Sequence, residues 1–128
     1  MTPEELKRRT KQFGLRVIKV VDGLPHQRAA DMIAKQLLRS GTSVGANYRS
    51  ACRGKSIPDW IAKVSISIEE ADESLYWMEM LVEANLLPKE KLTDLMQEAN
   101  EIISILTASV KTARNNLNKS SVITAARN

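Results

Sequence analysis

The sequence is poor in the residues that build disulfide-rich, membrane-spanning and many catalytic proteins. Only 4% of its 128 residues are aromatic, and it holds one cysteine, Cys52, and one histidine, His26. A lone cysteine excludes an intrachain disulfide, and so few aromatics imply a largely aliphatic core. No apolar run approaches the roughly 20 residues that cross a bilayer, and no leader pattern opens the chain. We therefore expect a cytoplasmic protein with a reduced thiol.

The scarcity of histidine also argues against metal-dependent and nucleophilic catalysis. Carboxylates in a helical bundle suggest a di-iron site, but that site needs Glu-x-x-His pairs on two helices. No histidine follows Glu70 or Glu73. The candidate nucleophiles, which lack a nearby histidine base, are Ser40, Thr42, Ser43 and Cys52. We expect no enzymatic activity, no metal and no cofactor, and keep an enzyme with a metal or small molecule in a bundle core as a distant alternative.

One stretch, residues 36–49, is rich in weak helix formers although its surroundings have helical periodicity. It contains two glycines, and each costs a helix roughly 1 kcal/mol relative to alanine. The apolar phase from Ile33 to Tyr48 nevertheless continues through it, which favours an unbroken helix. Gly41 and Gly45 are four residues apart, so they share a side on which another helix could approach closely. A kink is the alternative.

Periodicity and end signals divide the chain into four helices. Thr2 as N-cap, followed by Pro3, begins the first, and residues 22–25 end it with a glycine cap and a proline that opens the second. The second runs from about residue 25 to 53, and Ser56 or Ile57 caps the third. The apolar seam of the third helix comprises Ile61, Val64, Ile68, Ala71, Leu75, Met78 and Val82. That of the fourth comprises Leu92, Leu95, Ala99, Ile102, Leu106, Val110, Ala113 and Leu117.

Long helices with short connections predict an all-α fold, an antiparallel up-down-up-down four-helix bundle. We assign residues 1–117 to the bundle. Residues 118–128 are small and polar without periodicity, so we expect a flexible C-terminal tail.

Charge is distributed unevenly along the chain. Residues 1–63 carry 13 Lys and Arg against 5 Asp and Glu, and residues 64–128 carry 6 against 10, so balances of +8 and −4 give the net charge of +4. A basic half suits phosphate binding, although it also suits self-assembly or a merely solubilising surface. The candidate nucleic-acid-binding residues are Lys7, Arg8, Arg9, Lys11, Arg16, Lys19, Arg49, Arg53 and Lys55. Because no aromatics alternate with these cations, any binding should be to the backbone.

Polar residues near the apolar faces of the second and third helices suggest a structural network. We expect Arg39 to pair with Glu70 or Glu73 in a partly buried site, with Asn47 adding hydrogen bonds. Removing one partner of such a buried network should cost several kcal/mol, because the other charge is left unpaired.

Three aromatic residues of the third helix suggest a subunit interface. Trp77 and Tyr76 flank the seam, and Trp60 lies near the helix start. Such residues are enriched where proteins associate. Ordinary partial burial at the edge of the bundle is the alternative, above all for Trp60.

Two segments of the sequence carry a family resemblance. Residues 36–40 read Gln-Leu-Leu-Arg-Ser and residues 43–48 read Ser-Val-Gly-Ala-Asn-Tyr, and residues 69–77 read Glu-Glu-Ala-Asp-Glu-Ser-Leu-Tyr-Trp. The chain resembles, over roughly residues 10–117, the bacterial four helix bundle protein family encoded in intervening sequences of ribosomal RNA genes. It is also similar to the accessory variability determinant of diversity-generating retroelements.

The resemblance implies more than the residues themselves do. It implies a homo-oligomer, a pentamer in known relatives, and no established enzymatic activity. In the retroelement branch it implies binding to nucleic acid and to a reverse transcriptase through basic surface. We therefore expect a non-catalytic, oligomeric nucleic-acid-binding or ribonucleoprotein accessory protein. The alternative is an interaction scaffold that docks a partner protein such as a reverse transcriptase without binding nucleic acid.

Overall fold

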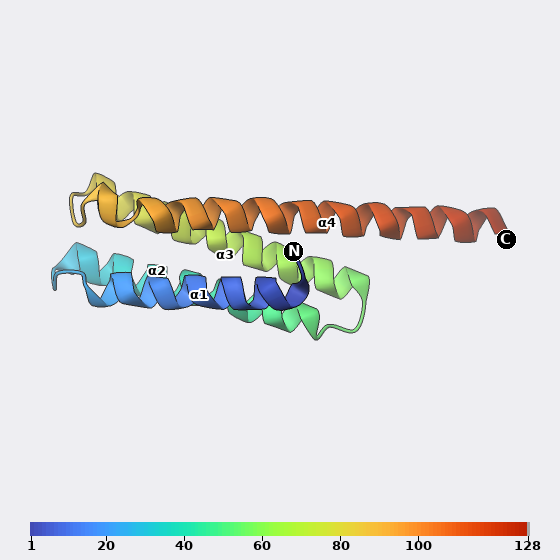
Figure 1. The fold of residues 1–128 in the computed structure, drawn as a ribbon, viewed down its shortest axis with the longest axis horizontal. Coiled ribbons are helices and arrows are strands. Elements are labelled where there is room, and N and C mark those ends of the chain that lie inside the picture. Colours follow the sequence, from blue (N-terminus) through green and yellow to red (C-terminus); the bar gives the residue numbers. More distant parts are fainter. Residues whose placement is uncertain (128) are drawn as a thin grey trace.

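The fold consists of four long α-helices that lie side by side (Figure 1). The computed structural model describes the backbone of residues 1–127 and the side chains of residues 1–119. The helices are α1 (Pro3–Asp22), α2 (Arg28–Cys52), α3 (Ile57–Glu83) and α4 (Thr93–Arg127), with a short 3₁₀ helix, η1 (Lys89–Lys91), before α4. The loops from α1 to α2 and from α3 to α4 share one end of the molecule, and the loop from α2 to α3 lies at the other. The predicted all-α four-helix bundle is confirmed.

Local sequence features fix the starts of α1 and α3 and the end of α3. Thr2 and Glu5 form a reciprocal capping box at the start of α1, and Ser56 accepts a hydrogen bond from the Asp59 N–H at the start of α3. Asn85 adopts a φ of 59° after α3, a conformation that asparagine tolerates better than most residues. The Leu86 N–H then donates to the Leu81 carbonyl at 2.9 Å, which closes a Schellman-type cap.

Two details of the second helix test the sequence analysis. Its predicted opening at Pro25 is wrong, because α2 begins at Arg28 after the extended residue Gln27. Its predicted continuity through Gly41 and Gly45 is confirmed, since α2 is helical throughout. Hydroxyls in this stretch donate back to the helix, as Ser43 does to the Arg39 carbonyl at 2.7 Å.

The core is largely aliphatic, with Phe13 and Tyr48 as its buried aromatics. The predicted seam of α4 is buried from Leu92 to Val110. On α3 the seam is buried as predicted at Ile61, Val64, Ala71 and Met78. At three other positions the buried residue is the one before the predicted residue: Ser67, Ser74 and Leu81 are fully buried, whereas Ile68, Leu75 and Val82 are only partly buried. The serines face α2, where small side chains allow close contact.

Helix α4 is longer than the sequence analysis allows. It remains helical to Arg127, and its C-terminal part projects beyond the ends of the other helices (Figure 1). Among residues 93–119, whose side chains the structure describes, the last buried residue is Val110, followed by the half-buried Ala113 and Leu117. The domain boundary at residue 117 and the flexibility of residues 118–128 stay predictions, and residue 128 lies outside the described residues.

Candidate nucleic-acid interface

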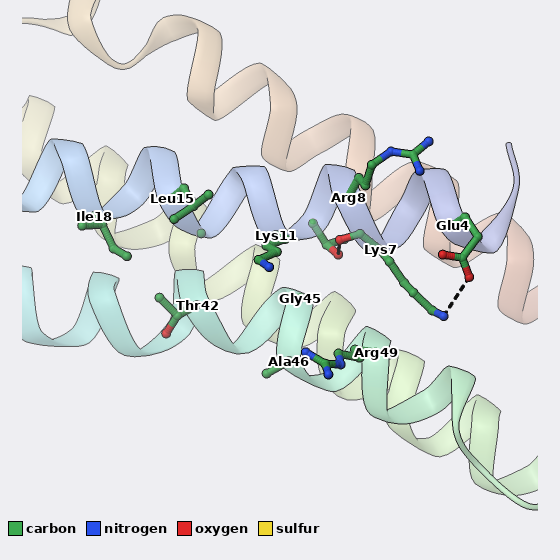
Figure 2. Close-up of a pocket in the computed structure, with 12 residues that line it drawn as sticks. Glu4, Lys7, Arg8, Lys11, Leu15, Ile18, Thr42, Gly45, Ala46 and Arg49 are labelled. Carbon is green, nitrogen blue, oxygen red and sulfur yellow. Dashed lines mark hydrogen bonds and ion pairs between the residues drawn. The ribbon is translucent and has the colours of Figure 1, made fainter.

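A surface groove of about 420 Å³ runs between helices α1 and α2 (Figure 2). We call it the α1–α2 groove. Its residues, taken along the two helices, are Glu4, Lys7, Arg8, Thr10, Lys11, Gly14, Leu15, Ile18, Thr42, Gly45, Ala46 and Arg49. Basic side chains gather towards the N-terminal end of α1, and apolar side chains occupy the other end.

Glycines bring the two helix backbones together beneath this groove. A Cβ atom on Gly45 would lie 3.1 Å from the backbone carbon of Thr10, and one on Gly14 would lie 3.4 Å from the Gly41 carbonyl oxygen. A Cβ atom on Gly41 would lie 2.7 Å from a methyl carbon of the buried Val17. The close approach that the glycine spacing predicts therefore takes place against α1, and it makes the groove shallow.

Lys11 and Arg49 enter the α1–α2 groove from opposite walls. Both side chains are exposed, and neither forms an ion pair with a described carboxylate. Arg8 is also free of such a pair, but in Figure 2 its side chain points away from α2. The groove therefore presents cations whose charge is not neutralised locally.

Lys7 differs from these cations because it is paired within its own helix. Its Nζ donates to Glu4 Oε1 at 2.9 Å, and this hydrogen bond lowers the pKa of Glu4 below its ordinary value. Glu4 is the only carboxylate that lines the groove, so the cations there outnumber it.

Arg9 belongs to a different contact, although the sequence groups it with its neighbours. Its Nε and Nη2 donate to the two carboxylate oxygens of Glu98 in α4 at 2.8 and 2.6 Å. Glu101 lies 3.5 Å from the same guanidinium, and the hydrogen bond to Glu98 raises the pKa of Arg9. Arg9 therefore joins α1 to α4.

The other predicted phosphate-binding residues lie outside the groove. Arg16 and Lys19 are exposed on α1, and Arg53 and Lys55 are exposed where α2 ends. Arg53 follows Arg49 by one helical turn, so it extends the cationic surface beyond the groove.

Comparison with known proteins places the chain in a family. The family model of the 23S rRNA-intervening sequence protein matches residues 4–108. The chain belongs to this family. A solved structure from Bacteroides thetaiotaomicron, described as a protein of unknown function from the S23 ribosomal protein family, shares 32% sequence identity. The match covers 87% of this chain and 99% of that one, with a TM-score of 0.81. Among curated proteins nothing matches.

The polar network predicted for this family member is only partly assembled. Arg39 donates to Glu73 at 2.6 Å and lies 3.2 Å from Glu70, and its hydrogen bond lowers the pKa of Glu73. Asn47 does not join them, because its amide donates to the Ser43 carbonyl at 2.9 Å. The Arg39 side chain is 50% exposed, whereas those of Glu70 and Glu73 are 17% and 36% exposed. The network is therefore partly buried on its α3 side and open to solvent at Arg39.

The predicted interface aromatics lie in different environments. Trp60 and Trp77 are half-buried and pack against the core, and Trp77 Nε1 donates to Glu73 at 3.3 Å. Tyr76 is 49% exposed, with its ring centroid 5.1 Å from that of Trp77. Of the three, Tyr76 is the one that presents its ring to solvent, and the role of all three in an interface stays a prediction.

Sequence reasoning missed several residues that matter to this family member. Ser67 donates to the Val44 carbonyl at 2.8 Å and Ser74 to the Ser40 hydroxyl at 3.0 Å, all in the buried α2–α3 contact. Serine is polar, so a search for apolar residues overlooks these positions. The available signal was the seven-residue spacing of Ser67 and Ser74, which places them on one face of the helix. Leu15 and Ile18 were also missed, and their spacing of three was the available signal for a shared face.

Catalytic groups are not brought together in the described part of the chain. His26 is fully exposed in the loop before α2, and Cys52 ends that helix roughly 40 Å away at 1.5 Å per residue. Burial raises the pKa of Tyr48.

Among the described residues no cluster of His, Cys, Asp or Glu could hold a metal ion. No described helix is long and apolar enough to cross a membrane. The expected absence of enzymatic activity stays a prediction.

Proposed function

We propose that this protein is a non-catalytic, cytoplasmic protein that binds the sugar–phosphate backbone of RNA or DNA through the α1–α2 groove. The approach of Lys11 and Arg49 from opposite walls of that groove carries the proposal. Unpaired cations at a surface displace the counterions that surround phosphates, which supplies sequence-independent affinity. A merely solubilising charge would not need to converge on one groove.

The position of these cations also limits the kind of recognition. Specific readout requires side chains that reach base edges, whereas the groove is shallow and has glycine backbone as its floor. Binding should therefore tolerate many sequences and weaken steeply with salt. If about three phosphates are contacted, raising the salt from 50 to 200 mM should weaken binding roughly 20-fold or more.

The decisive experiment compares two charge reversals that change net charge equally. The groove variant is Lys11→Glu with Arg49→Glu, and the control is Arg28→Glu with Lys35→Glu, two exposed cations of α2 outside the groove. Each variant takes the net charge from +4 to 0. We expect the groove variant to lose roughly tenfold or more in affinity for labelled RNA, measured by fluorescence anisotropy at low salt, and the control to lose much less.

Two results would contradict the proposal. One is an equal loss of affinity in both variants, which would assign the effect to net charge alone. The other is the absence of RNA and DNA binding by the unaltered protein at 50 mM salt.

A second candidate function, that of an interaction scaffold, is favoured by apolar side chains on the outer surface of α3. Ile66, Tyr76 and Met80 are 41%, 49% and 37% exposed there. Self-association through this surface would cover them, and the family resemblance supports a pentamer. The two functions are compatible, because the α3 surface and the α1–α2 groove use different residues.

A further inference from the structure

The α1–α2 groove has two chemically different halves. Leu15 and Ile18, which are 46% and 37% exposed, lie at one end opposite Thr42. Lys7, Lys11 and Arg49 lie at the other end with Glu4. A surface that binds phosphate alone has no use for large exposed aliphatic side chains beside its cations.

We infer that the groove accepts unpaired nucleotides of a single-stranded nucleic acid, with bases on the apolar half and phosphates on the basic half. This inference rests on the proposed function and names the class of ligand. Each base has an apolar face, and in a single strand that face is open to contact. In a duplex the base faces are stacked on one another, so only the basic half of the groove would be used.

Size and charge both agree with this occupant. The groove volume of about 420 Å³ lies within the range of roughly 300–1,000 Å³ that is usual for small-ligand sites. Lys7, Lys11 and Arg49 are the cations directed towards the groove, against the carboxylate of Glu4 among the described lining residues. A polynucleotide repeats an anionic group and a flat apolar group at short intervals, which complements a basic half adjoining an apolar half.

The aliphatic nature of the apolar half determines how strongly and how selectively it should bind bases. Leu15 and Ile18 can cover a base but cannot stack on it as an aromatic ring does, so the gain over phosphate contact is modest. We expect a preference for single strands over duplexes of about fivefold to tenfold, with little dependence on base identity.

The test measures three probes against the intact protein. They are a labelled oligouridine RNA, the same RNA annealed to oligoadenosine, and inorganic polyphosphate as a competitor that carries charge without bases. The groove variant is Leu15→Ser with Ile18→Ser. Its control is Met32→Ser with Leu38→Ser, which removes two side chains of similar exposure, 50% and 37%, from α2 outside the groove.

The expected result is tighter binding of the single strand than of the duplex by the unaltered protein and by the control. In the groove variant that preference should fall to nearly one, while inhibition by polyphosphate is unchanged. Equal affinity for single strand and duplex in the unaltered protein, or an undiminished preference in the groove variant, would overturn the inference and leave the proposed function standing. Failure to bind any of the three polyanions would overturn both and would favour an acidic protein segment as the occupant.

Discussion

Gly41 occupies the tightest contact between α1 and α2. A Cβ atom there would lie 2.7 and 2.8 Å from the two methyl carbons of Val17, a stiff side chain that is fully buried. Overpacking of this kind costs about 1–3 kcal/mol, against a gain of at most about 1 kcal/mol in helix propensity. We expect Gly41→Ala to lower the free energy of unfolding, measured by urea denaturation.

Two further variants separate the steric effect from other causes. Gly23→Ala places its Cβ at an ordinary 3.6 Å from the Lys19 carbonyl oxygen, at a negative φ, so it should be neutral or slightly stabilising. Val17→Ala removes the methyl groups that Gly41→Ala would meet, so the double variant should lose less than the sum of the single losses. Strict additivity would contradict the steric account.

Arg39 gives the protein a surface ion pair with a defined pH dependence. Its hydrogen bond lowers the pKa of Glu73 below 4.5 in the folded protein, so the pair's contribution is present above the unfolded pKa and is lost as pH falls through the folded pKa. We therefore expect Arg39→Met to be less stable than the parent at neutral pH and to approach it as the pH falls through the lowered pKa of Glu73. Thermal unfolding across this range measures the difference.

The matched control for this experiment is Arg49→Met, which removes another exposed arginine of α2 that pairs with no described carboxylate. Its effect on stability should be small at every pH. A deficit in Arg39→Met that stays constant from neutral to acid pH would show that the carboxylates do not cause it. Because Arg39 is half exposed, solvent screens its ion pairs. We therefore expect a loss of stability smaller than the several kcal/mol that a fully buried network would have implied.

At the scale of the helices, Arg9 is the main polar connection between α1 and α4. Its bidentate contact with Glu98 involves side chains that are 24% and 15% exposed. We expect Arg9→Met to destabilise the fold by about 1–2 kcal/mol, because the Glu98 carboxylate loses a charged partner. Chemical denaturation measures the loss.

This variant also separates structural from nucleic-acid-binding cations on one helix. Arg16→Met removes an exposed arginine of α1 that pairs with no described carboxylate. It should change stability by no more than about 0.5 kcal/mol. Arg9→Met should keep most RNA affinity, because Arg9 does not line the groove. If Arg9→Met lost as much RNA affinity as the Lys11→Glu, Arg49→Glu variant, the assignment of Arg9 to a structural role would be wrong.

The helices themselves show where sequence patterns are reliable. Periodicity and capping residues located all four, because each signal lies within a few residues of the structure it specifies. The buried serines of α3 escaped this reasoning. Ser67 and Ser74 lie in the contact with α2, where the Val44 carbonyl and the Ser40 hydroxyl accept their hydrogen bonds, and hydropathy cannot anticipate such a partner.

At the scale of the whole molecule, the exposed ring of Tyr76 provides a test of self-association. Aromatic residues and methionine are enriched in the cores of protein interfaces. A charge that is buried there without a partner is costly. We expect the unaltered protein to form an oligomer, with a pentamer as the expected size, and Tyr76→Asp to shift it towards monomers. Light scattering on a sizing column measures both.

Met32→Asp is a matched control, because Met32 on α2 is 50% exposed and Tyr76 is 49% exposed. That variant should keep the assembly of the unaltered protein. A monomeric unaltered protein would show that the prediction of an oligomer is wrong. An oligomer that persists in Tyr76→Asp would show that the interface does not include this part of α3.

The sequence by itself determined the four helices, the continuity of α2 through its glycines and the basic character of the first half, because these depend on local spacing and composition. Only the tertiary structure decided which cations are free. Arg9 and Lys11 are two residues apart, yet Arg9 meets Glu98 while Lys11 faces the groove opposite Arg49. That division depends on which helix packs against each side of α1. Local spacing along the chain does not determine such contacts, because they join residues that are far apart in the sequence.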